Sequence, residues 1–252
     1  MAKPKFFGEG IPYLDPPSLN LKGKLLVIEG TDGVGRTTQV ERLRNWLEIQ
    51  GHGVVETGWT RSELMSSLIQ LAKEGNTLTR DTFSLLYATD FADRLENQII
   101  PSLRSGFIVI SDRYVYTAFA RHMVRGGSRD WIRGVFGFAL VPDMVLYLKT
   151  DVESLVPRVI GSKGMDYWEA GMDLHLGEDL YDSFCVYQRR ILTEYDAMAE
   201  EFKFEVVDTV RRSVDEIQEE LRKRIEPIVR RTRKVDVSLL DARPADAKRE
   251  RG

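Results

Sequence analysis

Short apolar runs alternate with longer segments of helical periodicity from Leu25 onwards. Five runs have the continuous hydrophobic character of strands buried on both faces, namely residues 25–29, 54–56, 107–111, 144–148 and 204–208. Between them, apolar residues recur at spacings of three and four, which is typical of amphipathic helices. This alternation predicts an α/β fold with three layers, in which a central five-stranded parallel sheet is flanked by helices.

Several of the intervening segments carry signals for the ends of helices. The helix after the first strand is expected to end near Gly51, a candidate C-cap. The last helix, over residues 213–229, opens with Ser213 and Glu216 at capping-box spacing. The other predicted helices cover residues 62–72, 81–104, 131–139, 152–160 and 179–202. Pro101 is expected to bend the second of these.

Both ends of the chain lack this periodicity. Residues 1–21 are rich in Pro and Gly, and we interpret them as an irregular N-terminal arm whose aromatic residues can dock on the surface. Residues 230–252 are charged and weakly apolar, which favours a disordered tail. We therefore expect one domain over residues 22–229.

The overall composition excludes several classes of protein. The formal net charge of the 252 residues is −3, which argues against a nucleic-acid partner. The single cysteine, Cys185, cannot form an internal disulfide or build a zinc site by itself, and a reducing, cytoplasmic compartment fits best. The sequence has no apolar window of the roughly 18 residues that cross a bilayer. We expect no membrane attachment.

A glycine-rich turn with the sequence EGTDGVGRTTQ joins the first predicted strand to the first helix. Gly30 and Gly35, followed by Arg36 and Thr37, nearly reproduce the phosphate-binding loop of P-loop proteins. In such a loop the backbone N–H groups and the N-terminus of the next helix converge on phosphate. We expect ATP to contact Gly30, Thr31, Asp32, Gly33, Val34, Gly35, Arg36, Thr37 and Thr38.

Arg36 stands where this loop usually has lysine. Arginine keeps the positive charge but replaces a compact ammonium group with a planar fork, so its contact with the β- and γ-phosphates must differ in geometry. Thr37 offers a hydroxyl to Mg²⁺. Two alternatives remain open, an ordinary glycine-rich turn and a nucleotide-binding loop that has lost catalysis.

Polar residues follow directly after the third predicted strand. Open α/β sheets bind ligands at the carboxyl ends of their strands, so we expect Asp112 and Arg113 beside the glycine-rich turn. Asp112 can hold Mg²⁺ together with Thr37, and Arg113 can neutralise phosphate charge. The alternative is a surface turn with a salt bridge. Tyr114 and Thr117 are candidates for the mouth of an acceptor pocket, with plain packing and helix capping as their alternative.

The sequence resembles the thymidylate kinase family over residues 24–225. The resemblance rests on the stretches EGTDGVGRTTQ, LLYATDFADRLENQIIPSL, GFIVISDRYVYTAFA and PDMVLYLKTD. It implies a P-loop nucleoside monophosphate kinase that uses Mg²⁺ and transfers the γ-phosphoryl group of ATP to an acceptor such as dTMP. It also implies a homodimer and assigns Asp32 to the donor phosphates and the acceptor sugar. We accordingly assign catalysis to Asp32, Arg36, Asp112 and Arg113.

The acceptor site departs from the family pattern. The arginine that grips the acceptor phosphate in the family aligns with Phe91, while Asp90 remains and Arg94 follows one turn later. We therefore expect the phosphate contact from Arg94, or from Arg61 after the second strand. The family's base-reading Gln aligns near His122, which we interpret as a surface histidine. These departures leave open a P-loop kinase of another small-molecule acceptor, or a catalytically weak regulatory module that binds nucleotide.

A lid is expected at about residues 161–177. The segment that contains it, from Arg158 onwards, has only Arg158 and Lys163 as cations, whereas the family carries arginines there. Its glycines permit closure over the nucleotides, and Tyr167 and Trp168 are candidates to cover a base. The alternative is an exposed loop without this role.

Overall fold

The computed structural model describes residues 5–11, 19–75, 78–162, 164–230 and 232. In this part of the chain one five-stranded sheet has the order β2-β3-β1-β4-β5, and every strand pair is parallel. The strands are β1 (Lys24–Glu29), β2 (Val54–Gly58), β3 (Ile108–Asp112), β4 (Met144–Lys149) and β5 (Glu205–Asp208). The five predicted strands and the three-layer α/β class are confirmed.

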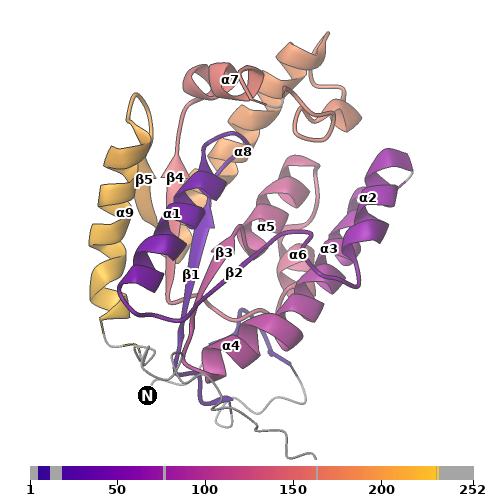
Figure 1. The fold of residues 1–252 in the computed structure, drawn as a ribbon. Helices are drawn as coiled ribbons and strands as arrows, with labels where there is room; N and C mark the ends of the chain where they lie inside the picture. Colours follow the sequence, from indigo (N-terminus) through magenta and orange to yellow (C-terminus); the bar gives the residue numbers. More distant parts are fainter. Residues whose placement is uncertain (1–4, 12–18, 76–77, 163, 231, 233–252) are drawn as a thin grey trace, which may run out of the picture.

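Helices cover both faces of the sheet (Figure 1). Helices α1 (Arg36–Ile49) and α9 (Val214–Val229) pack on one face. The other face is covered by a larger group that includes α3 (Arg80–Arg94), α4 (Ile100–Arg104), α5 (Val115–Val124), α6 (Arg129–Val135) and α8 (Leu180–Phe202). In Figure 1, α7 (Val152–Ile160) lies above the sheet, and α2 (Ser66–Gly75) lies at the right side of the molecule next to α3.

Residues of the central strand alternate between two hydrophobic cores. Leu26 and Ile28 pack with the residues of α1 and α9, whereas Leu25 and Val27 pack with the helices of the opposite face. All four side chains are at most 2% exposed. Because both faces are covered, polar residues have no place in the middle of this strand, which explains its continuous apolar run.

The register of the sheet determines where the site forms. Ile28 of β1 pairs with Asp112 of β3 on one side and with Leu146 of β4 on the other. The carboxyl ends of β1 and β3 therefore meet at the same edge of the sheet. This register places the turn after Glu29 beside Asp112 and the residues that follow it.

Two helical features differ from the prediction. Helix α5 was not predicted, because the residues from Val115 to Ala120 are all buried and leave no polar face to reveal a helical period.

The predicted bend of residues 81–104 is a π-helical turn over Leu95–Ile99, between α3 and α4. Pro101 follows it as one of the first residues of α4, and its missing N–H cannot continue the regular hydrogen-bond pattern. The Ser213–Glu216 capping box is confirmed.

The described part of the N-terminal arm pairs with the segment before β4. Phe6 forms an isolated antiparallel bridge with Leu140, and the backbone N–H of Phe7 donates to the carbonyl of Ala139 over 3.0 Å. The Phe7 ring contacts Phe119 edge-on, with ring centroids 6.0 Å apart. Residues 12–18 of the predicted arm and residues 233–252 of the predicted tail lie outside the described residues.

Among the described helices, none combines the length and apolar character that crossing a bilayer requires.

Candidate active site

Three glycines shape the turn between β1 and α1. Gly30, Gly33 and Gly35 have φ angles of 148°, 79° and 97°, which other residues rarely adopt. Gly33 packs closely on α7, where an added Cβ would lie 2.4 Å from Cγ2 of Val159. Helix α1 begins at Arg36 without a side-chain cap and without an acidic residue in its first turn. Its first N–H groups are therefore available to an anion.

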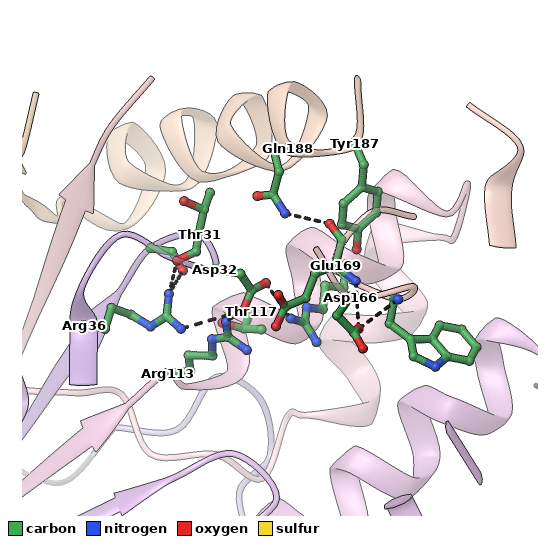
Figure 2. A network of polar contacts seen from close by, with 12 residues as sticks. Thr31, Asp32, Arg36, Arg113, Thr117, Asp166, Glu169, Tyr187 and Gln188 are labelled. Atoms are coloured by element: carbon green, nitrogen blue, oxygen red, sulfur yellow. Dashed lines mark hydrogen bonds and ion pairs between the residues drawn. The ribbon is translucent and has the colours of Figure 1, made fainter. Parts of the chain in front are cut away.

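The Arg36 side chain lies inside this turn. Its Nη1 donates to the carbonyl of Gly30 over 2.5 Å and to that of Thr31, and its Nε donates to Oδ1 of Asp112 over 2.9 Å. The residue is only 8% exposed. Figure 2 shows the guanidinium beside Thr31 and Asp32. In this structure it bonds the loop's own carbonyl groups and a carboxylate, whereas the sequence predicted a contact with phosphates.

Thr37 and Asp112 lie together as candidate metal ligands. The Thr37 hydroxyl donates to Oδ2 of Asp112 over 2.9 Å. The described residues contain no group of three or more acidic, histidine or cysteine residues arranged to hold a metal ion. One carboxylate and one hydroxyl fit Mg²⁺, which takes oxygen ligands and usually binds through one or two protein oxygens together with substrate phosphates.

Asp32 bridges two arginines at the same edge of the sheet. Arg113 donates to Oδ1 of Asp32, and Nη2 of Arg121 donates to Oδ2 over 2.9 Å. Arg113 has a φ of 71°, and its backbone N–H donates to the carbonyl of Ile28 over 3.0 Å. Burial and then the charge of Arg121 lower the pKa of Arg113 to about 10. Arg113 therefore stays positively charged at neutral pH.

Glu29 is a buried carboxylate that sequence analysis did not single out. It accepts hydrogen bonds from the backbone N–H of Tyr114 over 2.7 Å and from the hydroxyls of Thr117 and Tyr195, each over 2.8 Å. Burial outweighs these bonds and raises the pKa of Glu29. The apolar strand ending in a lone Glu was its only signal in the sequence. Glu29 ties the start of the phosphate loop to α5 and α8.

An aromatic pocket lies between α3, α5 and the segment before α8. The rings of Trp59 and Tyr87 lie 4.6 Å apart at one side, and those of Phe83 and Trp168 lie 4.9 Å apart at another. Nε1 of Trp59 donates to the carbonyl of Tyr114 over 2.9 Å. Flat aromatic walls of this kind suit a planar base.

A second, polar pocket lies next to it, above the phosphate loop. Trp59, Tyr87 and Arg121 line both pockets. The cations that line the polar pocket are Arg36, Arg61, Lys73, Arg113 and Arg121. Three carboxylates also line it, from Asp32, Asp112 and Glu169. The excess of cations suits a ligand with several phosphate groups.

The structure separates the residues that were predicted to bind the acceptor. Arg61 lines the polar pocket, and its Nη1 donates to Oε1 of Glu56 over 2.6 Å. Asp90 and Arg94 form a buried ion pair of 2.9 Å and are 0% and 3% exposed. Neither Asp90 nor Arg94 lines the pockets described above.

The two candidates at the start of α5 also point away from the large pockets. The Tyr114 hydroxyl donates to the carbonyl of Leu140 over 2.8 Å in the core, and its ring contacts Phe91 edge-on. The Thr117 hydroxyl bonds Glu29, as described above, and Thr117 borders a narrow cavity beside Asp32 and Arg121. Both residues pack or position others in this structure, which is the alternative that their sequence context left open.

His122 is a correction to the sequence analysis, which interpreted it as a surface residue. It is 3% exposed, stacks on Trp131 with ring centroids 5.0 Å apart, and lines the aromatic pocket. Its Nδ1 lies 3.0 Å from the Ser84 hydroxyl. Burial lowers the pKa of His122, so the ring is neutral at neutral pH. Packing of α5 against α3 and α6 buries it, and this packing is not visible in the local sequence.

The segment predicted as a lid contacts both sides of the aromatic pocket. Arg125, directly after α5, forms a bidentate ion pair with Asp173, with Nε–Oδ2 and Nη2–Oδ1 distances of 2.8 and 3.1 Å. Nε1 of Trp168 donates to the carbonyl of Lys73 at the end of α2, over 3.2 Å. Lys163, one of the two predicted cations, lies outside the described residues.

A phosphate-binding turn after the central strand, with a carboxylate at the end of the neighbouring strand, places this chain among the P-loop nucleotide-binding proteins. A family model described as thymidylate kinase matches residues 28–175. The chain therefore belongs to the thymidylate kinase family, as its sequence predicted.

Relatives from three organisms agree with this assignment. The chain is 41% identical over 206 residues to "Probable thymidylate kinase 2" of Saccharolobus solfataricus, a match that covers 81% of this chain and 95% of that protein. It is 30% identical to "Probable thymidylate kinase" of Pyrococcus abyssi, covering 80% of this chain and 95% of the relative. The relative from Methanocaldococcus jannaschii is also 30% identical, and the match covers 78% of this chain and 92% of that protein.

Proposed function

We propose that this protein is a nucleoside monophosphate kinase that transfers the γ-phosphoryl group of ATP to dTMP, with Mg²⁺ as cofactor. The observation that carries the proposal is the position of the phosphate loop beside a cationic pocket that shares three lining residues with an aromatic one. The first can take the phosphate groups of two nucleotides and the second a base. Family membership supports the choice of dTMP among possible acceptors.

On the donor side, the backbone N–H groups of the loop and of the first turn of α1 would hold the ATP phosphates. The Thr37 hydroxyl and the Asp112 carboxylate would hold Mg²⁺, directly or through water. Bound Mg²⁺ supplies charge neutralisation on the β- and γ-phosphates. For Arg36 to contact phosphate, its guanidinium must exchange the carbonyl groups of Gly30 and Thr31 for phosphate oxygens.

On the acceptor side, Tyr87 and Trp59 would hold the base, and the neighbouring cations would hold the phosphate. Arg113 lines the polar pocket close to the loop, where charge develops on the transferred group. Trp168 would help to exclude water from this space. No covalent intermediate is required, because alignment and charge stabilisation account for phosphoryl transfer of this kind.

A coupled assay of Mg²⁺-ATP with dTMP, dUMP, dCMP, dGMP and AMP tests the proposal. We expect dTMP to give the highest kcat/KM. A different preferred acceptor would instead support a P-loop kinase of another small molecule. Tight ATP binding without turnover of any acceptor would support a regulatory module, a possibility that the engagement of Arg36 with Asp112 keeps open. The exposed pair Arg129–Glu194 provides a control, because Arg129→Ala should leave all rates unchanged.

We also propose that the protein is a cytoplasmic homodimer. Three leucines in and just before α2 are exposed, with Leu64, Leu68 and Leu71 at 63%, 51% and 65%. An apolar surface of this kind favours burial against a second copy. Light scattering on the wild type and on Leu68→Glu tests this. We expect a dimer that becomes monomeric in the variant, and a monomeric wild type would contradict the proposal.

A further inference from the structure

Arg121 lies where the aromatic and polar pockets join. It lines both pockets and also the narrow cavity beside Thr117. In a nucleoside monophosphate the sugar separates the base from the 5′-phosphate. When the base occupies the aromatic pocket, the phosphate therefore falls near the junction of the two pockets. Arg121 is a cation at that junction.

The guanidinium of Arg121 keeps most of its donors available. Its Nη2 donates to Oδ2 of Asp32 over 2.9 Å, and its side chain is 21% exposed. Within the described residues its other N–H groups make no hydrogen bond that competes for them. Arginine has five N–H donors in a fixed fork, so it can bind Asp32 and a phosphate at the same time.

The other arginines near the aromatic pocket are already committed. Arg80 lines this pocket but not the polar one, and it donates to Asp81 and to the carbonyl of Arg125. Arg94 is buried against Asp90 and lines neither pocket. Arg125 is held by both carboxylate oxygens of Asp173 and by the Tyr187 hydroxyl. This leaves Arg121 as the best-placed arginine between a base and the polar pocket.

Arg113 and Arg61 are the remaining arginines that sequence analysis considered for phosphate. Both line the polar pocket but not the aromatic one, and Arg113 donates to Asp32 of the phosphate loop. The Arg61 side chain is 42% exposed and pairs with Glu56. An ion pair near the surface contributes little free energy, because water and salt screen the attraction between its charges. Arg61 therefore provides a matched comparison for Arg121.

We propose that Arg121 binds the 5′-phosphate of the acceptor nucleotide, and that Asp32 holds its guanidinium in position. This inference rests on the proposed function and deepens it, because it names the residue that recognises a monophosphate over its nucleoside. It replaces Arg94 and Arg61, the two residues from which sequence analysis expected this contact. The cation missing at Phe91 is thus supplied from α5, a different element that reaches the same pocket.

Binding of dTMP and of thymidine to the protein without ATP tests this inference. The fluorescence of Trp59 and Trp168, which line the aromatic pocket, can report both ligands. We expect Arg121→Gln to weaken dTMP binding about 50-fold, which is the range for loss of a charged hydrogen bond, and to leave thymidine binding within about twofold. Arg121→Lys should recover part of the loss, and Arg61→Gln should weaken dTMP binding less than about fivefold.

Two results would overturn the inference, and they are distinguishable. If wild-type protein bound dTMP no better than thymidine, and no other monophosphate in the acceptor panel better than its nucleoside, the proposed acceptor site itself would be wrong. If wild type showed the preference and Arg121→Gln kept it, only the role of Arg121 would be wrong. Unchanged ATP affinity and an unchanged thermal unfolding midpoint in Arg121→Gln confirm that the variant is folded.

Discussion

Arg36 and Asp112 form a buried ion pair, in which Nε of Arg36 lies 2.9 Å from Oδ1 of Asp112. The second carboxylate oxygen of Asp112 accepts the Thr37 hydroxyl. Both oxygens of the proposed metal ligand are therefore engaged by residues of the phosphate loop and α1. A cation that binds Asp112 must compete with the guanidinium for this carboxylate.

Replacing Arg36 with lysine tests that competition. The lysine ammonium is compact and cannot contact the carbonyl groups of Gly30 and Thr31 and the carboxylate of Asp112 as a planar fork does. We expect Arg36→Lys to lower the Mg²⁺ concentration for half-maximal activity about fivefold, a change of about 1 kcal/mol. The measurement is initial rate against Mg²⁺ at saturating nucleotides. Arg42→Lys, on an exposed part of the same helix, should not shift this concentration.

Removal of the Asp112 carboxylate should abolish most of the activity. We expect Asp112→Ala to lose at least about 100-fold in kcat, because a charge that orients the metal is absent. Steady-state kinetics against Asp215→Ala, whose side chain is 87% exposed, gives the comparison. Turnover of Asp112→Ala at the wild-type rate would remove this residue from the mechanism.

Glu29 should make folding stability depend on pH. Its pKa in the folded protein lies above the ordinary value of 4.5, so in the interval between the two pKa values the folded state binds more protons than the unfolded state. Stability from this group therefore falls as pH rises from 4.5 through the folded pKa. We expect urea unfolding of Glu29→Gln to lack this fall, whereas Glu226→Gln at an exposed position should keep it.

Glu29→Ala should lower the free energy of unfolding more than Glu29→Gln, which removes only the charge. Glu29→Ala leaves the N–H of Tyr114 without its acceptor and leaves the hydroxyls of Thr117 and Tyr195 only the bond to each other. We expect a loss of about 3 kcal/mol in the free energy of unfolding at pH 7, measured by urea titration. A loss below about 1 kcal/mol would show that water replaces the carboxylate without difficulty.

Tyr87 should contribute to acceptor binding through its ring. It faces the aromatic pocket and lies 4.6 Å from the Trp59 ring. Stacking of a base on an aromatic side chain contributes about 1–3 kcal/mol. We expect Tyr87→Ala to raise the KM for dTMP at least about tenfold while the KM for ATP changes less than about twofold. Tyr181→Ala, at a tyrosine that is 51% exposed and outside both pockets, should change neither constant.

The sheet and the phosphate loop were predictable because their signals are local. A strand buried on both faces must be apolar throughout, as in Leu25–Ile28, and a loop that wraps phosphate needs glycines such as Gly35 at fixed positions. Helix α5 was missed for a related reason. Full burial of its first two turns gives it the apolar character of a strand without a helical period.

The acceptor side was less predictable because it depends on which way each helix faces. Asp90 and Arg94 lie on a buried side of α3, where they pair with one another. Asp90 also accepts a hydrogen bond from the N–H of Ser62 in the segment after β2. His122 and Arg121 are neighbours on α5, yet one is stacked on Trp131 and the other reaches Asp32. These directions follow from packing between helices that are distant in sequence.

The contacts of Trp168 with Lys73 and of Arg125 with Asp173 link the segment before α8 to α2 and to the end of α5 beside the aromatic pocket. We expect at least one of these contacts to open before a nucleotide binds in that pocket. The observed association rate should consequently level off at high dTMP concentration, at the opening rate of this segment, and stopped-flow mixing would measure that plateau.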